Sequence, residues 1–360
     1  MTTLSRAAVL SLLLLMARPC PSEADEPINR LLNLTIPQSF AFCGEAVPLD
    51  REDVLERLDL ELMDTLGSQM RTALWLTRVP RYFPAIEAAL REKGLPQDLK
   101  YVAVIESNLR DDAVSSAGAA GPWQFMRTTA EACGLEKSDW RDPVRSWEDS
   151  TQAALAHLTD LRQAFSSWAL VLAAYNAGSG RVKRAMEAQG MADFYGLRLP
   201  RETERYVFRA FAAKLVIENP EQYGIQLKDA RLYFPEETEA AELRVERRSA
   251  PLWAVARAAE VSYRMLFRLN PWLTGSDLPR GTHPLRIPKE SKDRFQLAYS
   301  RWEAENREPR TVRYRVRGGD TLASVARRHG VDVDDLRAWN NLGSRSQLKK
   351  GQELLLYRED

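Results

Sequence analysis

One glutamate stands where a side chain could donate a proton. Residues 101–105 form a run too apolar for the surface of a helix, and this run ends at Glu106, directly before a loop. A carboxyl group in such a place is partly desolvated, which raises its pKa and keeps a proton available near neutral pH. From this segment alone, a solvated or helix-capping glutamate is the alternative. Glu106 is predicted to be a general acid if its neighbours form a binding site.

The loop after Glu106 is built from small residues. Residues 115–121 read Ser-Ser-Ala-Gly-Ala-Ala-Gly and leave the backbone unobstructed, so that an extended ligand can lie against it. Gln124 follows on a helix predicted over residues 122–130, and its amide offers both donor and acceptor groups. An amide and hydroxyl groups beside an apolar floor are typical of sites that hold a sugar chain. The sequence therefore predicts a glycan site next to the acid.

These residues occur with two later blocks in an order known from one enzyme family. The motifs are Glu106-Ser107-Asn108, Ser115, Gly118-Ala119, Gly121, Gln124-Phe125-Met126, Ala174-Tyr175-Asn176-Ala177-Gly178, and Glu202-Thr203 with Tyr206-Val207. In this order and spacing they resemble the signature blocks of the soluble-type lytic transglycosylases, whose fold is that of goose-type lysozyme. Residues 40–100 are similar to the D-type branch of the membrane-bound murein transglycosylases. The resemblance covers nearly the whole chain after residue 24.

The resemblance implies a reaction for which one carboxylate is enough. The implied substrate is peptidoglycan, cleaved at the β-1,4 bond between N-acetylmuramic acid and N-acetylglucosamine. Glu106 would first protonate the leaving oxygen and then take the proton of the substrate's own C6 hydroxyl, which leaves a 1,6-anhydro end. The N-acetyl group of the substrate is implied to share the positive charge at C1. No cofactor is implied.

The resemblance also implies which residues surround the acid. The substrate-binding residues predicted in this way are Ser107, Ser115, Gln124, Met126, Tyr175, Glu202 and Tyr206. Two of them have a structural alternative, Tyr175 as a core aromatic residue and Glu202 as a first-turn residue that suits the helix dipole. Asn176 and Gly178 are expected to build a turn rather than to contact sugar.

Two other functions compete with the lytic one. The first is hydrolysis of the same bond, as in goose-type lysozyme, with Asp111 or Asp112 holding a water molecule. The second is a murein-binding scaffold with an inactive catalytic domain. The presence of the acid and its neighbouring motif residues favours an enzyme over the scaffold.

The elements that must position these residues are mostly helical. Apolar residues recur at helical spacing from residue 54 to residue 90, and further helices are predicted over residues 99–107, 150–174 and 202–217. The predicted fold class is mainly α. It comprises a lysozyme-like all-α catalytic domain at residues 81–228, an N-terminal helical segment at residues 25–80 packed on it, and two small α+β LysM-type modules.

The two modules are predicted from an internal repeat. Beyond residue 235 the chain matches itself at an offset of seventy residues. Identical residues at this offset include Leu252 and Leu322, Asn270 and Asn340, and Gly281 and Gly351. Each copy is predicted to form strand, helix, helix and strand, and the charged residues 289–310 are predicted to form a linker, helical or flexible.

The second copy, residues 311–358, resembles a LysM domain, a module that binds polymers containing N-acetylglucosamine. The resemblance implies a glycan site at Gly319, Asp320, Thr321, Asn340 and Asn341. From the residue types alone, the glycine permits a tight turn and the aspartate caps the first helix. The first copy, residues 242–288, is a degenerate LysM-like module, since it lacks that turn, and is expected to bind sugar poorly.

The composition excludes several classes of function. The chain has 360 residues, and 51 Lys and Arg nearly balance 50 Asp and Glu, so no overall positive field attracts nucleic acid. Three cysteines and three histidines lack the paired spacings of metal sites. Cys43 and Cys133 could form a disulfide or remain two buried free thiols. The expected partners are peptidoglycan strands, and the expected state is a monomer.

The first residues have the pattern of a targeting signal. Arg6 precedes an apolar run at residues 7–17, and a small-residue cleavage pattern at residues 22–24 predicts a signal peptide over residues 1–24. The expected location is the periplasm or cell envelope. A lipid anchor at Cys20 is disfavoured because Arg18 and Pro19 precede it. No later stretch is apolar and long enough to cross a membrane, although peripheral attachment stays an alternative.

Overall fold

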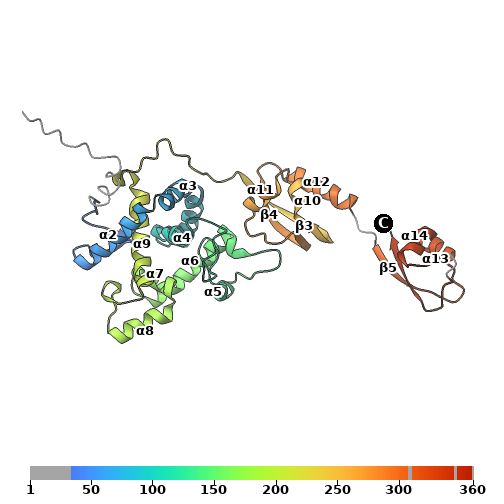
Figure 1. The fold of residues 1–360 in the computed structure, drawn as a ribbon, viewed down its shortest axis with the longest axis horizontal. Helices are drawn as coiled ribbons and strands as arrows, with labels where there is room; N and C mark the ends of the chain where they lie inside the picture. Colours follow the sequence, from blue (N-terminus) through green and yellow to red (C-terminus); the bar gives the residue numbers. More distant parts are fainter. Residues whose placement is uncertain (1–33, 307–309, 344–346, 359–360) are drawn as a thin grey trace, which may run out of the picture. The chain divides into compact units, whose positions relative to one another are not determined.

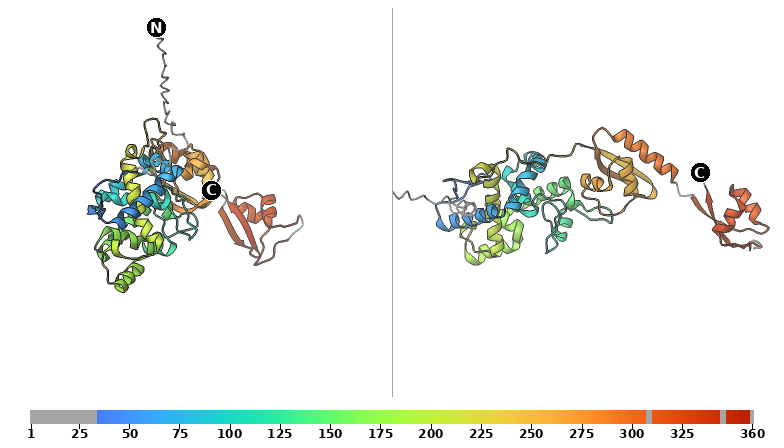
Figure 2. Two further views of the ribbon diagram at one scale, coloured as in Figure 1. Left: turned by 60° about the vertical axis from the view of Figure 1, so that its left-hand side comes forward. Right: turned by 45° about the horizontal axis from the view of Figure 1, so that its top comes forward.

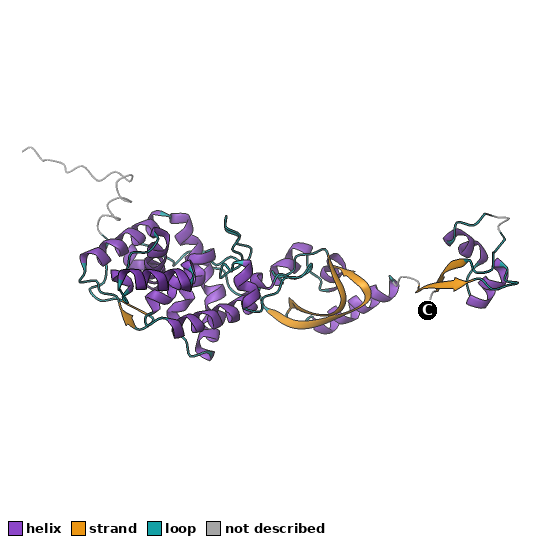
Figure 3. Ribbon diagram, turned by 90° about the horizontal axis from the view of Figure 1, so that it is seen from below, coloured by secondary structure: helices purple, strands orange, loops and turns teal. Residues whose placement is uncertain are grey.

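The chain forms two compact units. The computed structural model describes residues 34–306, 310–343 and 347–358 (Figure 1). One unit comprises the residues up to Pro235 except Asp139–Arg141, and the other comprises those three residues and the chain from Glu236 onward. Figure 3 shows helices throughout the first unit and the longer strands in the second, which confirms the mainly α fold class. The predicted signal peptide and Cys20 lie outside the described residues.

The first unit is a bundle of helices with one short hairpin. The helices are α2 (Glu52–Gly67), α3 (Gln69–Glu92), α4 (Lys100–Ser107), α5 (Arg127–Ala132), α6 (Trp147–Ala164), α7 (Trp168–Ala177), α8 (Ser179–Gln189) and α9 (Arg201–Glu218). Strand β1 (Ala41–Phe42) pairs antiparallel with β2 (Glu45–Ala46). One continuous hydrophobic core extends through these elements.

Helix α9 connects the parts of this bundle. It contacts α2, α4 and α7, and the views in Figures 1 and 2 show it in yellow beside the blue helix α2. Large aromatic side chains such as Phe208 and Phe211 are fully buried on it, and apolar burial of this size is the main source of a helix's stability in a protein. Helix α9 therefore places its remaining polar side chains at fixed positions against the neighbouring helices.

Two predicted helices differ from the structure. The helix predicted over residues 122–130 begins only at Arg127, because Gly121 (φ +81°) and Gln124 (φ +50°) adopt the left-handed conformation of a turn. Ala120 pairs there with both Val114 and Phe125. The helix predicted over residues 150–174 is divided into α6 and α7, and the Ser167 hydroxyl caps α7 by accepting a hydrogen bond from the Leu170 backbone N–H at 3.3 Å.

The second unit contains two modules, each with the order strand, helix, helix and strand. The first consists of β3 (Thr238–Pro251), α10 (Leu252–Ala258), α11 (Tyr263–Leu269) and β4 (Asp277–Pro288). The second consists of β5 (Arg310–Arg315), α13 (Leu322–His329), α14 (Val333–Trp339) and β6 (Glu353–Arg358). In each module the two strands pair antiparallel, and each module has its own hydrophobic core.

The segment between the two modules contains a helix. Residues Lys292–Glu305 form helix α12, which packs on β3 and α10. Its Phe295 and Tyr299 are buried in the core of the first module. The charged linker predicted at residues 289–310 thus contains a helix that belongs to the module before it, because its apolar residues recur at a spacing of four on one face.

Two further observations concern the cysteines and the membrane. Cys43 and Cys133 are free thiols, the second of the two alternatives considered for them, and burial raises the pKa of Cys43 above its ordinary value. Within the described ranges, no helix combines the length and the apolar character needed to cross a bilayer.

Candidate active site

The end of α4 holds Glu106 in a defined place. Asn108 caps this helix in the left-handed conformation (φ +53°), and its backbone N–H donates to the Val104 carbonyl at 2.9 Å. Helix α3 holds the same residue, since the Trp75 indole N–H donates to Asn108 Oδ1 at 2.6 Å and the Arg78 guanidinium donates to the Asn108 carbonyl at 2.8 Å. The position of Glu106 is therefore fixed by both α4 and α3.

Glu106 has the electrostatics of a proton donor. The Tyr206 hydroxyl on α9 donates to Glu106 Oε1 at 2.7 Å. Burial raises the pKa of Glu106 to about 7, against the lowering effects of this hydrogen bond and of the Arg209 guanidinium, while the Glu202 carboxylate raises it further. Desolvation is thus the dominant cause, as the apolar segment before Glu106 predicted. The carboxyl group can hold and release a proton near neutral pH.

Tyr175 on α7 completes the surroundings of the acid. Its hydroxyl donates to the Trp123 carbonyl at 2.9 Å. Burial, followed by the nearby Glu106 carboxylate, raises the pKa of Tyr175 well above its ordinary value, and the same two causes act on Tyr206. Both phenols therefore stay protonated and can act as hydrogen-bond donors. Helices α4, α7 and α9 bring these three predicted residues together.

Ser115 and Gln124 shape the loop beside the acid. The Ser115 hydroxyl accepts from the Ala119 backbone N–H at 3.0 Å, and the Ser115 N–H donates to the Ala119 carbonyl at 2.8 Å. The Gln124 side-chain amide donates to the Gly121 carbonyl at 2.8 Å and to the Ala113 carbonyl at 3.2 Å. These contacts use the donor side of Gln124 and leave its carbonyl oxygen as the group able to meet a ligand.

Gly121 is required by the turn. Its φ of +81° lies in the left-handed region, and a Cβ built on it would lie 1.9 Å from the Val144 carbonyl oxygen. Only a residue without a side chain fits this close approach of two backbone segments. The small residue at this position is thus explained by packing.

Other predicted site residues lie differently from expectation. Ser107 is buried, and its hydroxyl donates its proton to the Ala103 carbonyl and accepts from the Arg110 N–H, so its hydrogen bonds are made within the protein. Glu202 lies in the first turn of α9, as its structural alternative predicted, and pairs with Arg209 at 3.3 Å. Met126 is 45% exposed and precedes α5.

The LysM residues divide into structural and exposed ones. Asp320 does not cap α13. Thr321 does so, while the Asp320 carboxylate accepts from the Tyr314 hydroxyl and the Arg317 N–H, which together with Arg328 lower its pKa to about 2. The predicted glycan ligand Asn340 instead ties α14 to β6 through the Leu336 and Leu355 carbonyls and the Leu355 N–H.

The remaining two predicted LysM residues are turn residues with positive φ. Gly319 has a φ of +87°, in the tight turn expected for it, and Asn341 has a φ of +53° and an exposed side chain. Both therefore remain candidates for contact with a ligand.

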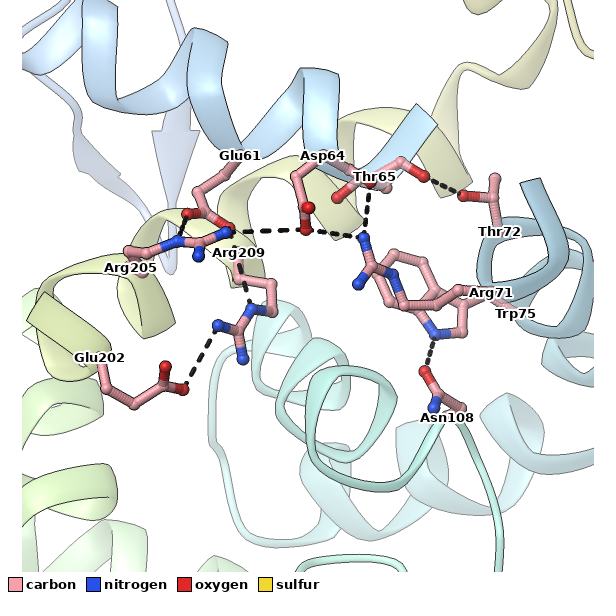
Figure 4. A network of polar contacts seen from close by, with 10 residues as sticks. All are labelled: Glu61, Asp64, Thr65, Arg71, Thr72, Trp75, Asn108, Glu202, Arg205 and Arg209. Atoms are coloured by element: carbon pink, nitrogen blue, oxygen red, sulfur yellow. Dashed lines mark hydrogen bonds and ion pairs between the residues drawn. The ribbon is translucent and has the colours of Figure 1, made fainter. Parts of the chain in front are cut away.

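An arginine-rich network near the acid was not predicted from the sequence. Figure 4 shows Glu61 and Asp64 of α2 facing Arg205 and Arg209 of α9. The signal for it was the spacing of Glu202, Tyr206 and Arg209, which places all three on one face of a helix. Glu61, the partner of Arg205 and Arg209, could not be found in this way because it is distant in the sequence.

The described residues contain no group of three or more His, Cys, Asp or Glu side chains placed to hold a metal ion.

Comparisons with known proteins identify both regions of the chain. The family model of the transglycosylase SLT domain matches residues 83–196, and that of the LysM domain matches residues 314–356. These matches confirm the lysozyme-like catalytic domain and the C-terminal LysM domain predicted from the motifs.

Relatives were found among curated proteins. The chain is 33% identical over 296 residues, 78% of its length, to "Membrane-bound lytic murein transglycosylase D" from two strains of Escherichia coli. It spans 64% of the length of these relatives. It is also 32% identical over 123 residues to a "Putative tributyltin chloride resistance protein" from an Alteromonas species. This match covers 33% of the chain and 59% of that protein.

One solved structure is similar in part. It is an inactive mutant of lytic transglycosylase Slt from Pseudomonas aeruginosa, with 21% identity and a TM-score of 0.32, over 42% of this chain and 26% of that one.

Proposed function

Since the chain contains a transglycosylase SLT domain followed by a LysM domain, we propose that it is a peptidoglycan lytic transglycosylase. The observation that carries the proposal is the environment of Glu106, whose pKa near 7 allows one group to act first as acid and then as base. The substrate is the glycan strand, cleaved between N-acetylmuramic acid and N-acetylglucosamine.

The reaction proceeds in two proton transfers through Glu106. In the first, the protonated carboxyl donates to the glycosidic oxygen as the bond from C1 to that oxygen breaks. In the second, the carboxylate takes the proton of the C6 hydroxyl as O6 bonds to C1, which gives the 1,6-anhydro end and returns Glu106 to its protonated form. The substrate loses no atoms and gains no water, so both products together have the mass of the substrate.

A second carboxylate is not needed for this route, and the charges near Glu106 support that view. Among the described carboxylates, Glu202 is the one that affects the pKa of Glu106, and it is 65% exposed and paired with Arg209. Asp112 forms an ion pair with Arg110 at 2.9 Å. Both of these carboxylates are thus held by arginines. Asp111, the other residue considered for holding a water molecule, has a pKa raised mainly by burial, so the end group of the product decides between the two reactions.

We assign the predicted ligands on the same basis. Ser115, the Gln124 carbonyl oxygen, Tyr175 and exposed Met126 are proposed to contact the glycan, whereas Tyr206 acts on it through Glu106. Ser107 and Glu202 are not included, for the reasons given by their contacts. In the LysM domain, Gly319 and Asn341 are proposed to lie at the glycan, and Asp320, Thr321 and Asn340 to shape the fold that presents them. The proposed location is the cell envelope, where the glycan is found.

The test is mass spectrometry of the soluble products released from purified sacculi. Products that carry anhydro ends, lighter by one water than reducing-end products, are expected from the wild type. Glu106→Gln keeps the shape but cannot transfer a proton, and is expected to lower the rate by at least about 100-fold. Glu87→Gln is the matched control, since it removes a carboxylate that is paired with Lys100. Reducing-end products would support the hydrolase instead, and binding of sacculi without release would support the scaffold.

A further inference from the structure

A buried carboxylate lies on α2, the helix that packs on α9, outside the region matched by the SLT family model. Glu61 on α2 is 1% exposed. Its carboxylate is hydrogen-bonded to the Arg205 guanidinium and lies 3.8 Å from Arg209 Nε (Figure 4). A buried carboxylate is costly unless it is paired, so these two arginines are what allows Glu61 to be there. The chain keeps an interior ion pair where an apolar residue would fill the space.

The arginines come from the helix that also contacts the acid. Glu202, Tyr206 and Arg209 stand at positions i, i+4 and i+7 of α9 and share one face. Tyr206 donates to Glu106, and the Arg209 charge lowers the pKa of Glu106. Arg209 is thus close enough to the acid to influence its proton, although its own ion pairs are with Glu61 and Glu202.

An unrestrained cation at this place would oppose the reaction. A guanidinium paired directly with Glu106 would favour the carboxylate, and the first proton transfer needs the protonated form. Glu61 on α2 offers Arg209 a buried partner, and solvent screens an ion pair with a buried group less than it screens an exposed ion pair. Glu202 is the nearer partner of Arg209, at 3.3 Å, but it is 65% exposed, and solvent weakens an ion pair there.

We propose that Glu61 is a positioning residue for catalysis. Its carboxylate on α2 holds the guanidinium of Arg209, a residue of α9, away from a direct ion pair with Glu106. The inference rests on the proposed function, because it concerns the acid of that reaction. It gives helix α2, which lies outside the matched catalytic domain, a part in setting the protonation of the active site.

Four groups of the described residues act on Glu106 or are acted on by it. They are Tyr206, Arg209 and Glu202 from α9 and Tyr175 from α7. The two tyrosines stay neutral, so Arg209 and Glu202 are the charged groups through which a change at Glu61 can act. A merely structural role for Glu61 would lower activity equally at every pH.

The experiment is the pH dependence of kcat/KM for soluble glycan strands in four proteins: wild type, Glu61→Gln, Arg209→Met and Glu87→Gln. Glu61→Gln is expected to move the alkaline limb to lower pH by about 0.5 to 1 unit, a loss of about 3- to 10-fold above the limb with recovery below it. Arg209→Met is expected to move the limb the other way, because a nearby positive charge is lost. Glu87→Gln, which removes an ion pair of α4 itself, should leave the limb in place.

Opposite shifts in the first two variants would support the proposal, and parallel shifts or unchanged limbs would overturn it. If Glu61→Gln does not fold, Glu61→Asp retains the charge with a shorter reach, and its limb together with that of Arg209→Met decides in the same way. Titration of the Glu106 carboxyl by NMR, assigned by its loss in Glu106→Gln, follows the same shifts without turnover. An inactive wild type with these titration shifts would therefore reject the proposed function and not the ion-pair arrangement.

Discussion

At the scale of single residues, the protonation of Glu106 controls when the site can work. Burial raises its pKa to about 7, so the carboxyl is mostly protonated below that pH and mostly ionised above it. Because the free enzyme must offer a proton in the first step, kcat/KM is expected to be high below pH 7 and to fall about tenfold per pH unit well above it. A rate profile on soluble glycan strands measures this limb. A limb near pH 4 or 5 would show an ordinary exposed carboxyl and contradict the desolvated site.

The Tyr206 hydroxyl offers a second residue-scale prediction. It donates to Glu106 and so favours the charged form of the acid. Tyr206→Phe is expected to raise the pKa of Glu106 and to move the alkaline limb to higher pH by about one unit. Tyr223→Phe is the control, because the buried Tyr223 hydroxyl has no hydrogen-bond partner among the described residues. A limb moved to lower pH in Tyr206→Phe would contradict the direction of this hydrogen bond's effect.

The sequence predicted the acid better than its surroundings. Glu106 could be identified because desolvation depends on its own apolar helix, which is a local feature. The internal hydrogen bonds of Ser107 and Asn340 were not predicted, because the partners of small polar side chains depend on tertiary packing, which residue type does not reveal. The Glu61 network was missed because it joins two helices that are distant in the sequence.

At the scale of elements, the turn between α4 and α5 rests on one glycine. In Gly121→Ala, the new methyl group would lie 1.9 Å from the Val144 carbonyl oxygen at a φ of +81°. We expect a loss of at least about 2 kcal/mol in the free energy of unfolding, measured by thermal or denaturant unfolding. Gly118→Ala also has positive φ but meets open space, so it should cost only about 1 kcal/mol. Equal costs for the two variants would contradict the close approach.

Hydrophobic periodicity located the helices but not all of their ends. The pattern continued across residues 165–167, where Ser167 begins a new helix, because buried apolar residues on both sides hide the break. It also extended a helix back over residues 122–126. There Gln124 bonds the Gly121 and Ala113 carbonyls with its side chain and stabilises a turn instead.

The two strand–helix–helix–strand modules share an asparagine with one structural role. Asn270 bonds the Leu266 and Arg286 carbonyls and the Arg286 N–H, just as Asn340 bonds Leu336 and Leu355. The same role accounts for an asparagine at this position in both modules. The repeat in the sequence therefore reported a shared fold.

Asn340→Ala is accordingly expected to act on stability. Loss of the side chain leaves backbone groups of the α14 and β6 junction without partners, at a cost of about 1–3 kcal/mol in the free energy of unfolding of this module. Asn341→Ala removes an exposed side chain and should be close to neutral in stability. Weaker glycan binding by Asn340→Ala without any loss of stability would restore the ligand role first predicted for it.

At the scale of the whole molecule, the described residues form three separate hydrophobic cores. The first lies within residues 40–223, the second within residues 241–299 and the third within residues 314–356. Since no buried residue is shared among them, a chain ending at Asn306 keeps two complete cores and is expected to fold. It should cleave soluble glycan strands with kcat/KM within about twofold of the full chain, yet pellet less with sacculi, because linked binding modules raise avidity. Co-sedimentation and product release measured in parallel test this division. Equal loss in both would mean that the LysM domain supports catalysis itself and is not only a tether.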